Sequence, residues 1–238
     1  GVENVSSVAT AGVTQTRLEG AARGAGFNFL FSTADLNGDG IRDVVVASPT
    51  EDRNGRAGSG TVYVIFGGPN LALSQEISLA SGATVGLRIE GAAAGDVLGD
   101  RILGMGDVNG DGVDDLVVSA RGADNNARAN SGSVYVLFGR SSWATPVIDL
   151  NALGGFDLRF DGATAGDLFG GTFSVGDVDM DGIGDLLVGA LSADNNARPN
   201  SGSLYVILGR GAWPAAITDM AVTFDARYDG AVAADQTG

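Results

Sequence analysis

Short apolar runs bounded by turn residues make up most of the hydrophobic pattern of this chain. One set begins with Asp, continues with mostly aliphatic residues, and covers residues 43–47, 115–119 and 185–189. A second set ends just before or at a glycine and covers residues 61–66, 133–138 and 203–208. Short apolar runs between turn signals are typical of strands that are buried on both faces. No window of about 11 residues has a convincing helical period, so the pattern predicts an all-β protein.

Two further kinds of strand are expected beside these runs. Residues 102–106 and 172–176 precede acidic loops and are predicted to be strands. Residues 87–90 and 158–161 alternate apolar and polar side chains, which is the pattern of an edge strand. Each part of the chain that contains one copy of every kind of run is therefore expected to form four strands.

The chain repeats itself about every 70 residues. Three acidic segments of the form D-x-[ND]-x-D-G-x-x-D start at Asp35, Asp107 and Asp177, which are 72 and 70 residues apart. Other landmarks keep the same spacing: Tyr63, Tyr135 and Tyr205; Trp143 and Trp213; Gly20, Gly91, Gly162 and Gly230. A four-stranded unit that recurs in this way is typical of the blades of a β-propeller.

The period divides the chain into a leading segment, three repeat units and the start of a fourth. These cover residues 1–16, 17–86, 87–157, 158–226 and 227–238. Propellers usually have four to eight blades, so three units are expected to be part of a longer array. Assembly of several copies into a ring or filament is the alternative, and a self-sufficient stack of three units is a third possibility.

The acidic segments have the chemistry of calcium loops. Ca²⁺ takes six to eight oxygen ligands, and alternate side chains of a tightly curled loop can point to one centre. We expect Gly112 to permit the sharp turn after the third ligand, where a Cβ would clash. The predicted ligands are Asp35, Asn37, Asp39, Asp43 and the Ile41 carbonyl; Asp107, Asn109, Asp111, Asp115 and the Val113 carbonyl; and Asp177, Asp179, Asp181, Asp185 and the Ile183 carbonyl.

Other interpretations of these loops are weaker. Asp, Asn and Gly also populate ion-free β-turns for local reasons. Three loops that each pack several carboxylates into nine residues would, however, repel strongly without a cation. Mg²⁺ demands octahedral geometry and retains its waters, and transition metals favour nitrogen or sulfur ligands, which the loops lack. The sequence predicts about three bound Ca²⁺ ions.

Composition excludes several classes of function. The 238 residues carry 29 acidic and 14 basic side chains, a net charge of −15, and every basic residue is Arg. Because Lys, His and Cys are absent, disulfides, Cys or His metal sites, Ser-His-Asp triads and Lys Schiff bases are excluded. The negative charge argues against nucleic acid as a partner. No apolar stretch approaches the roughly 18 residues of a membrane span. The 39 glycines are consistent with many tight turns between short strands.

Motifs around the acidic loops resemble those of the FG-GAP repeat, which forms the propeller blades of integrin alpha chains and of many bacterial secreted proteins. The family name refers to Phe-Gly before the calcium loop and Gly-Ala-Pro after the next strand. The matching positions are Phe27-Asn28, Leu98-Gly99 and Phe169-Gly170, then Ala47-Ser48-Pro49, Ser119-Ala120-Arg121 and Gly189-Ala190-Leu191. The resemblance covers about residues 17–238. It implies a cation in the hairpin between the first two strands of each blade, and a ring of about seven blades.

Three other repeated features have a functional and a structural interpretation. The loops at residues 51–56, 123–128 and 193–198 could bind a sugar or a partner chain, or be held by Asx turns and an Arg–Asp pair. Trp143 and Trp213 could stack on carbohydrate, but are expected to pack between blades. Four arginines precede an acidic residue by two positions and are expected to form cross-blade ion pairs: Arg17, Arg88, Arg159 and Arg227.

The sequence predicts a non-catalytic, calcium-stabilised propeller segment that is extracellular or at the cell surface. Its expected roles are adhesion, protein–protein or glycan binding, or surface structure. No residue is predicted to be catalytic, because the clustered carboxylates are assigned to cations and arginine is a poor general base. The alternatives are a propeller module of a secreted polysaccharide-degrading enzyme and a self-assembling subunit of a ring or filament. The absence of Cys fits a bacterial secreted protein that uses calcium in place of disulfides.

Overall fold

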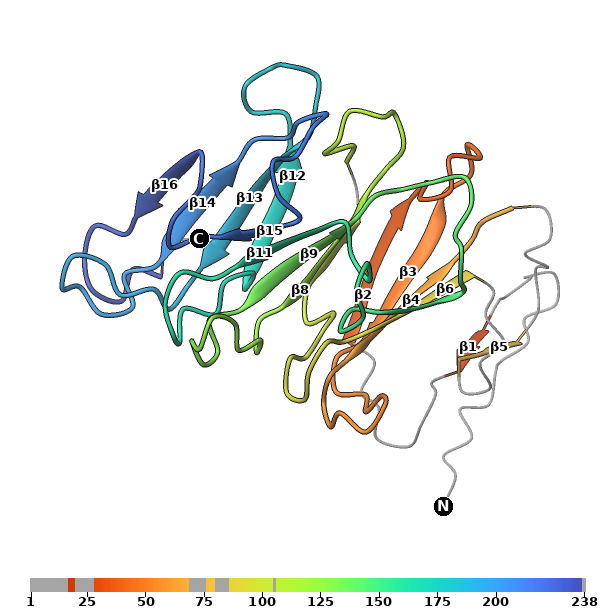
Figure 1. Ribbon diagram of the computed structural model, residues 1–238, viewed down its shortest axis with the longest axis horizontal. Helices are drawn as coiled ribbons and strands as arrows, with labels where there is room; N and C mark the ends of the chain where they lie inside the picture. Colours follow the sequence, from red (N-terminus) through yellow and green to blue (C-terminus); the bar gives the residue numbers. More distant parts are fainter. Residues whose placement is uncertain (1–16, 20–27, 69–75, 80–85, 105, 237–238) are drawn as a thin grey trace, which may run out of the picture.

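The computed structural model describes residues 17–19, 28–68, 76–79, 86–104 and 106–236. All regular structure in these residues is β, in 16 strands (Figure 1). None of the described residues forms a helix that is long and apolar enough to cross a membrane. The all-β fold predicted from the sequence is therefore confirmed. The leading segment 1–16, Gly20 and Phe27 lie outside the described residues.

The strands form three larger sheets and one pair. The first sheet has the order β10-β6-β4-β3-β2, with bounds Val147–Asp149, Gly86–Glu90, Thr61–Ile65, Asp43–Ser48 and Asn28–Ala34. The second has the order β15-β11-β9-β8-β7, with bounds Ile217–Asp219, Leu158–Asp161, Ser133–Leu137, Leu116–Ala120 and Ile102–Gly104. The third has the order β12-β13-β14-β16, with bounds Thr172–Gly176, Asp185–Ala190, Ser203–Ile207 and Ala226–Asp229. β1 (Arg17–Glu19) pairs with β5 (Glu76–Ser78).

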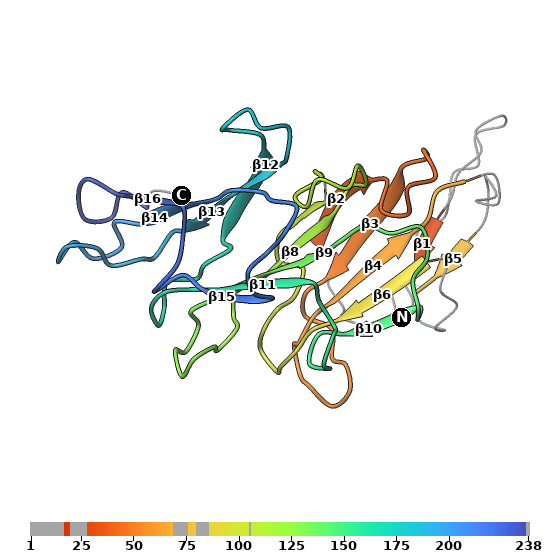
Figure 2. The ribbon, with the colours of Figure 1, turned by 45° about the horizontal axis from the view of Figure 1, so that its top comes forward.

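Each sheet has the up-and-down strand order of a propeller blade, and the three sheets follow one another along the molecule (Figures 1 and 2). Within each sheet the first four strands in sequence pair antiparallel, as in β2-β3-β4-β6. The first strand of a sequence unit thus completes the sheet of the unit before it, because β6 pairs with β4. The 70-residue units are therefore offset by one strand from the sheets.

The strands with alternating apolar and polar residues are not edge strands in the first two sheets. β6 and β11 each gain a second neighbour, the short parallel strands β10 and β15. Each of these three-residue strands lies near the end of the sequence unit that its partner β6 or β11 begins, so each of the first two sheets has five strands. The edge-strand expectation fails at these two places because the added strands come from about 60 residues further along the chain. In the part of the chain that the structure describes, β16 has a partner on one side only.

The two faces of the second sheet pack against different neighbours. Leu116 and Val118 of β8 belong to a core shared with the first sheet, whereas Val117 between them belongs to a core shared with the third. Because side chains alternate across a strand, an uninterrupted apolar run is what a sheet sandwiched between two others requires. Trp143 and Trp213 pack against these two inter-sheet cores. The expectation that they lie between blades is confirmed.

The Phe-Gly position of the family motif packs tightly between sheets. Leu98 and Phe169 are fully buried. Gly99 has a φ of +85°, and an added Cβ would lie 2.6 Å from the Cβ of Ala47 in β3. A side chain is excluded here both by backbone conformation and by lack of space.

Substitution of Gly99 tests this packing. Gly95→Ala is the matched control, because Gly95 has a φ of +81° and no heavy atom within 4 Å of an added Cβ. Both variants incur about 1–2 kcal/mol of backbone strain, and Gly99→Ala incurs a further 1–3 kcal/mol or so from overpacking. Urea unfolding of the two variants measures the difference. Equal destabilisation by the two substitutions would contradict the packing described here.

Candidate metal centres

The three acidic loops each join two adjacent strands of one sheet. The first connects β2 to β3, the second β7 to β8, and the third β12 to β13. Each of these strand pairs is antiparallel. All 15 predicted ligand residues lie within these hairpin connections or at the first residue of the strand that follows, in agreement with the place that the family resemblance implies.

The first acidic residue of each loop accepts backbone hydrogen bonds from across the loop. In the second loop, Asp107 accepts from the N–H groups of Gly110 at 2.6 Å, Asp111 at 3.0 Å and Gly112 at 2.6 Å. In the first loop, Asp35 accepts from residues 39 and 40. In the third, Asp177 accepts from residues 181 and 182. These bonds curl all three loops in the same way.

The third and fifth positions face each other across the turn. Asn109 Oδ1 accepts the N–H of Asp111 at 2.9 Å, and its Nδ2 donates to Asp111 Oδ2 at 2.9 Å. Asp111 Oδ1 in turn accepts the N–H of Val113 at 2.9 Å. Asn37 and Asp39 repeat these contacts. The third loop has Asp179 in place of Asn, so it has one more carboxylate and no amide donor.

The ninth position carries a buried carboxylate in every loop. Asp43, Asp115 and Asp185 have no solvent exposure. Asp115 Oδ2 accepts the N–H of Val108 at 2.8 Å, and its Oδ1 accepts that of Gly139 at 2.9 Å. Burial raises the pKa of Asp115 to about 7 and raises that of Asp43, despite the two backbone hydrogen bonds that each accepts. The neighbouring carboxylates at the first and fifth positions raise both pKa values further.

The third loop gathers its carboxylates most closely. Ligand oxygens of Asp177, Asp179 and Asp185 all lie within 4.8 Å of one another. No other group of three acidic side chains among the described residues meets this condition, including those of the first two loops. In those loops Asn37 and Asn109 take the third position, and their amide oxygens have the hard character that Ca²⁺ prefers. The inward direction of the Ile41, Val113 and Ile183 carbonyls stays a prediction.

Gly112 takes the sharp turn that the sequence predicts. An added Cβ would meet no heavy atom beyond its chain neighbours within 4 Å, so the restriction lies in the local backbone. Gly112 is required because its φ is +86°, and Gly40 and Gly182 have φ values of +84° and +90°. The third loop also contains Met180 at a φ of +66°, where the other two loops have glycine.

The donor set fits a hard divalent cation. The predicted ligand side chains are carboxylates and amides, and the charged neighbours that raise the pKa of the buried Asp115 and Asp43 are other carboxylates. An anion in such surroundings is unfavourable unless a cation offsets the repulsion. When bound, Ca²⁺ would supply that charge and cross-link the two strands of the hairpin.

The other repeated features make internal contacts in the described residues. The arginine pairs lie within one strand and not across blades: Arg88 with Glu90 at 2.8 Å, Arg159 with Asp161 at 2.8 Å and Arg227 with Asp229 at 2.9 Å. Residues two apart share one face of a strand, and the side chains reach each other there. The loops at 51–56, 123–128 and 193–198 are each closed by an Asp that accepts a backbone N–H six residues on, at 2.7 Å.

Sequence reasoning missed a recurring buried carboxylate. Asp96 and Asp167 are 3% and 4% exposed, and burial raises the pKa of each to about 6. Asp96 accepts the N–H of Ala93 at 2.9 Å, and Asp235, two repeats further along, accepts that of Val232 in the same turn. The signal was present in the sequence, because all three stand in the same Ala-x-Asp context.

Comparison with known proteins identifies the repeat. The FG-GAP repeat matches residues 27–65, 101–137 and 169–207, which are the three hairpins with their loops and the strand that follows each. The chain is therefore an all-β protein that carries three FG-GAP repeats.

The particular proteins that it resembles are integrin alpha chains and a phospholipase. It is 29% identical to integrin alpha-4 of Xenopus laevis and 30% identical to integrin alpha-PS5 of Drosophila melanogaster, over 74% of this chain in both cases. It is 35% identical to mouse phosphatidylinositol-glycan-specific phospholipase D over 45% of this chain. The match spans 12 to 16% of the length of these relatives.

Asp96 gives the metal-free protein a testable pH dependence. Its raised pKa means that the folded state holds a proton more tightly than the unfolded chain does, so its contribution to stability is lost as pH rises from about 4 to about 6. We expect the free energy of unfolding of Asp96→Asn to rise relative to that of the unsubstituted chain across this window. Urea unfolding in EGTA at a series of pH values measures it. Asp235→Asn, at an exposed copy of the same turn, is the matched control, and identical trends for the two variants would contradict the assignment.

Proposed function

We propose that this chain is a calcium-binding, non-catalytic segment of an extracellular β-propeller, which serves adhesion, protein–protein or glycan binding, or surface structure. The observation that carries the proposal is the threefold repetition of one loop geometry. In each copy the first, fifth and ninth positions keep their carboxylates, and the ninth is fully buried beside the others. Local turn formation does not require a buried carboxylate, whereas a cation site does benefit from it.

Each loop would hold one Ca²⁺ ion. The residues that would bind it are those at positions one, three, five and nine, with the carbonyl at position seven: residues 35–43, 107–115 and 177–185. Oxygen-only donors favour Ca²⁺ over transition metals. Because calcium is abundant outside cells, binding can act there as folding free energy.

Similarity to integrin alpha chains supports a binding role over a catalytic one. The proposed location outside cells rests on the calcium requirement and on this similarity. A bacterial secreted protein stays a prediction.

A second candidate function is a propeller module of a larger enzyme. It is favoured by the similarity to phosphatidylinositol-glycan-specific phospholipase D, which covers less than half of this chain. The described residues offer little for catalysis, because the clustered carboxylates are assigned to cations. Turnover of a polysaccharide or a phospholipid by this chain would establish it, and the proposal of a non-catalytic segment would then be wrong.

Calcium titration of loop variants tests the proposal. Asp111→Asn removes one negative charge from a predicted ligand in the second loop, so we expect isothermal calorimetry to report two unchanged sites and one site weakened by about tenfold or more. EGTA should also lower the melting temperature of the unsubstituted chain. A chain that melts at the same temperature in calcium and in EGTA would contradict calcium binding.

Asp114→Asn is the matched control. Asp114 lies in the same loop at a position that is not a predicted ligand, and its Oδ2 accepts the N–H of Asp35 at 3.0 Å. The variant loses the same charge and retains an amide oxygen as acceptor. We expect all three sites to bind, with a smaller loss of affinity in the second loop than for Asp111→Asn.

A further inference from the structure

Two segments of equal length cross from one sheet onto the sheet before it. They cover residues 139–150 and 209–220, and we call them straps. Each strap has the sequence Gly-Arg-x-x-Trp, three further residues, then an apolar residue, one residue, Asp and an apolar residue. Each begins just after the third strand of its own sheet and includes the short parallel strand β10 or β15.

The beginning of each strap docks on the acidic loop of the preceding sheet. The N–H of Arg140 donates to the carbonyl of Leu36 at 2.9 Å, and the N–H of Arg210 donates to that of Val108 at 3.1 Å. Leu36 and Val108 are both the second residue of a candidate calcium loop, and both are fully buried. The strap therefore covers the loop at its entry.

The end of each strap adds a parallel strand to the outer edge of the preceding sheet. Arg88 of β6 donates its N–H to the Pro146 carbonyl at 2.9 Å, and Leu150 donates to the Glu90 carbonyl at 3.0 Å. The second strap repeats both bonds, from Arg159 to the Ala216 carbonyl at 2.7 Å and from Met220 to the Asp161 carbonyl at 2.9 Å.

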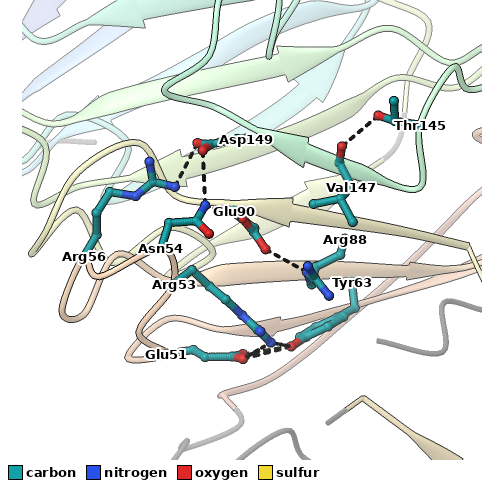
Figure 3. A network of polar contacts seen from close by, with 10 residues as sticks. All are labelled: Glu51, Arg53, Asn54, Arg56, Tyr63, Arg88, Glu90, Thr145, Val147 and Asp149. Atoms are coloured by element: carbon teal, nitrogen blue, oxygen red, sulfur yellow. Dashed lines mark hydrogen bonds and ion pairs between the residues drawn. The ribbon is translucent and has the colours of Figure 1, made fainter. Parts of the chain in front are cut away.

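The same set of polar side chains contacts the carboxylate of each strap. Asp149 of the first strap accepts from Arg56 at 2.8 Å and from Asn54 at 3.1 Å, and Asn54 also donates to Glu90 at 2.6 Å (Figure 3). In the second strap, Asp219 accepts from Arg128 at 2.8 Å and lies 3.4 Å from Asn126. The Asn and the Arg come from the repeated loop whose role the sequence left open. That loop is a receptor for the strap carboxylate.

The third sheet has every part of this receptor. Asn196 and Arg198 occupy the loop positions, Arg227 and Asp229 the edge strand β16, and Val178 the second residue of the acidic loop. Ser203 donates to Asp229 at 2.9 Å, as Ser133 does to Asp161 at 2.8 Å in the second sheet, so the receptor has the same local geometry. Among the described residues, however, no segment pairs with the outer edge of β16 and no carboxylate contacts Arg198.

Exposure distinguishes the third sheet from the other two. Val178 is 51% exposed, whereas Leu36 and Val108 are fully buried. Tyr228 of β16 is 60% exposed, whereas its counterpart Phe160 is 1% exposed and packs edge-on against Trp213 of the second strap, with ring centroids 5.7 Å apart. The apolar side chains at these positions are buried under the next unit in the first two sheets, but they are exposed in the third sheet.

The face of the third sheet continues the same interface. Val117, Val134 and Val136 of the second sheet are fully buried against the third. The equivalent residues of the third sheet, Leu187, Leu204 and Val206, are only partly buried. A partner that completes this interface must place apolar side chains against this face of the third sheet. It must also place the carboxylate of a strap beside Arg198.

We propose that the acidic loop, the Asn196–Arg198 loop and the outer edge of β16 form a binding site for a strap of the same sequence type, carried by another repeat unit of this kind. The unpaired strand edge offers backbone hydrogen bonds, Trp of the strap fills the place beside Tyr228, and its Asp pairs with Arg198. The contacts of the straps on the first two sheets indicate which charge the bound strap must carry and how it must align with β16. Calcium in the third loop would order the residues on which the strap begins.

The experiment uses the full chain and a synthetic peptide with the sequence of residues 139–150. Titration into the ¹⁵N-labelled, calcium-loaded chain should shift the amide signals of Val178, Arg227 and Asp229 saturably below about 1 mM. Amide exchange of Arg227 should slow by about tenfold or more at saturation. The absence of any change at these residues at about 1 mM, or equal changes with a scrambled peptide, would overturn the proposal.

A double-mutant cycle tests the charge pairing. Asp149→Asn in the peptide should weaken binding several-fold to the unsubstituted chain, and should have no further effect on the Arg198→Ala chain. Arg101→Ala, which removes an exposed arginine elsewhere, is the control and should leave the effect of the peptide substitution unchanged. Additive effects of the two substitutions would show that Asp149 does not meet Arg198.

The competing occupant is the β16 edge of a second copy. Light scattering of the concentrated chain would then report a dimer that the peptide fails to dissociate, and the strap site would be wrong. A monomer, or a dimer that the peptide dissociates, supports the strap site.

Discussion

A fully buried carboxylate at the end of each acidic loop connects the main parts of a repeat. Asp115 accepts one backbone N–H from within its own loop and one from Gly139, the first residue of a strap. Asp43 and Asp185 make the equivalent pair of bonds. Because a buried charge is costly unless it is well satisfied, this residue constrains the loop, the end of the third strand and the departure of the strap together.

Burial of both faces of each sheet governs how the repeats stack. The second sheet shares one core with the first and another with the third, and it contributes alternate residues of the same strands to each. The straps add to this stacking by joining each unit to the one before it at the acidic loop and at the outer strand edge. The conformation of a loop and the packing between units are therefore linked through shared residues such as Val108.

Much of this could be predicted from the sequence because its signals are local. The aliphatic runs that became β3, β8 and β13 were expected within one residue of their bounds, and the nine-residue loops were recognisable by spacing alone. The short strands β10 and β15 could not be found, because three residues carry no usable period and their partners lie about 60 residues away. The same holds for the raised pKa of Asp96, which depends on burial that only packing creates.

The sequence by itself determined the class of fold, the repeat length and the composition of the candidate metal loops, since each depends on residue type and short-range spacing. Only the tertiary structure decided which sheet the strand at residues 86–90 joins, and that Asp149 reaches Arg56 of the unit before. These contacts join residues far apart in the chain, and their geometry follows from how the apolar faces stack. Local sequence pattern carries no record of that stacking.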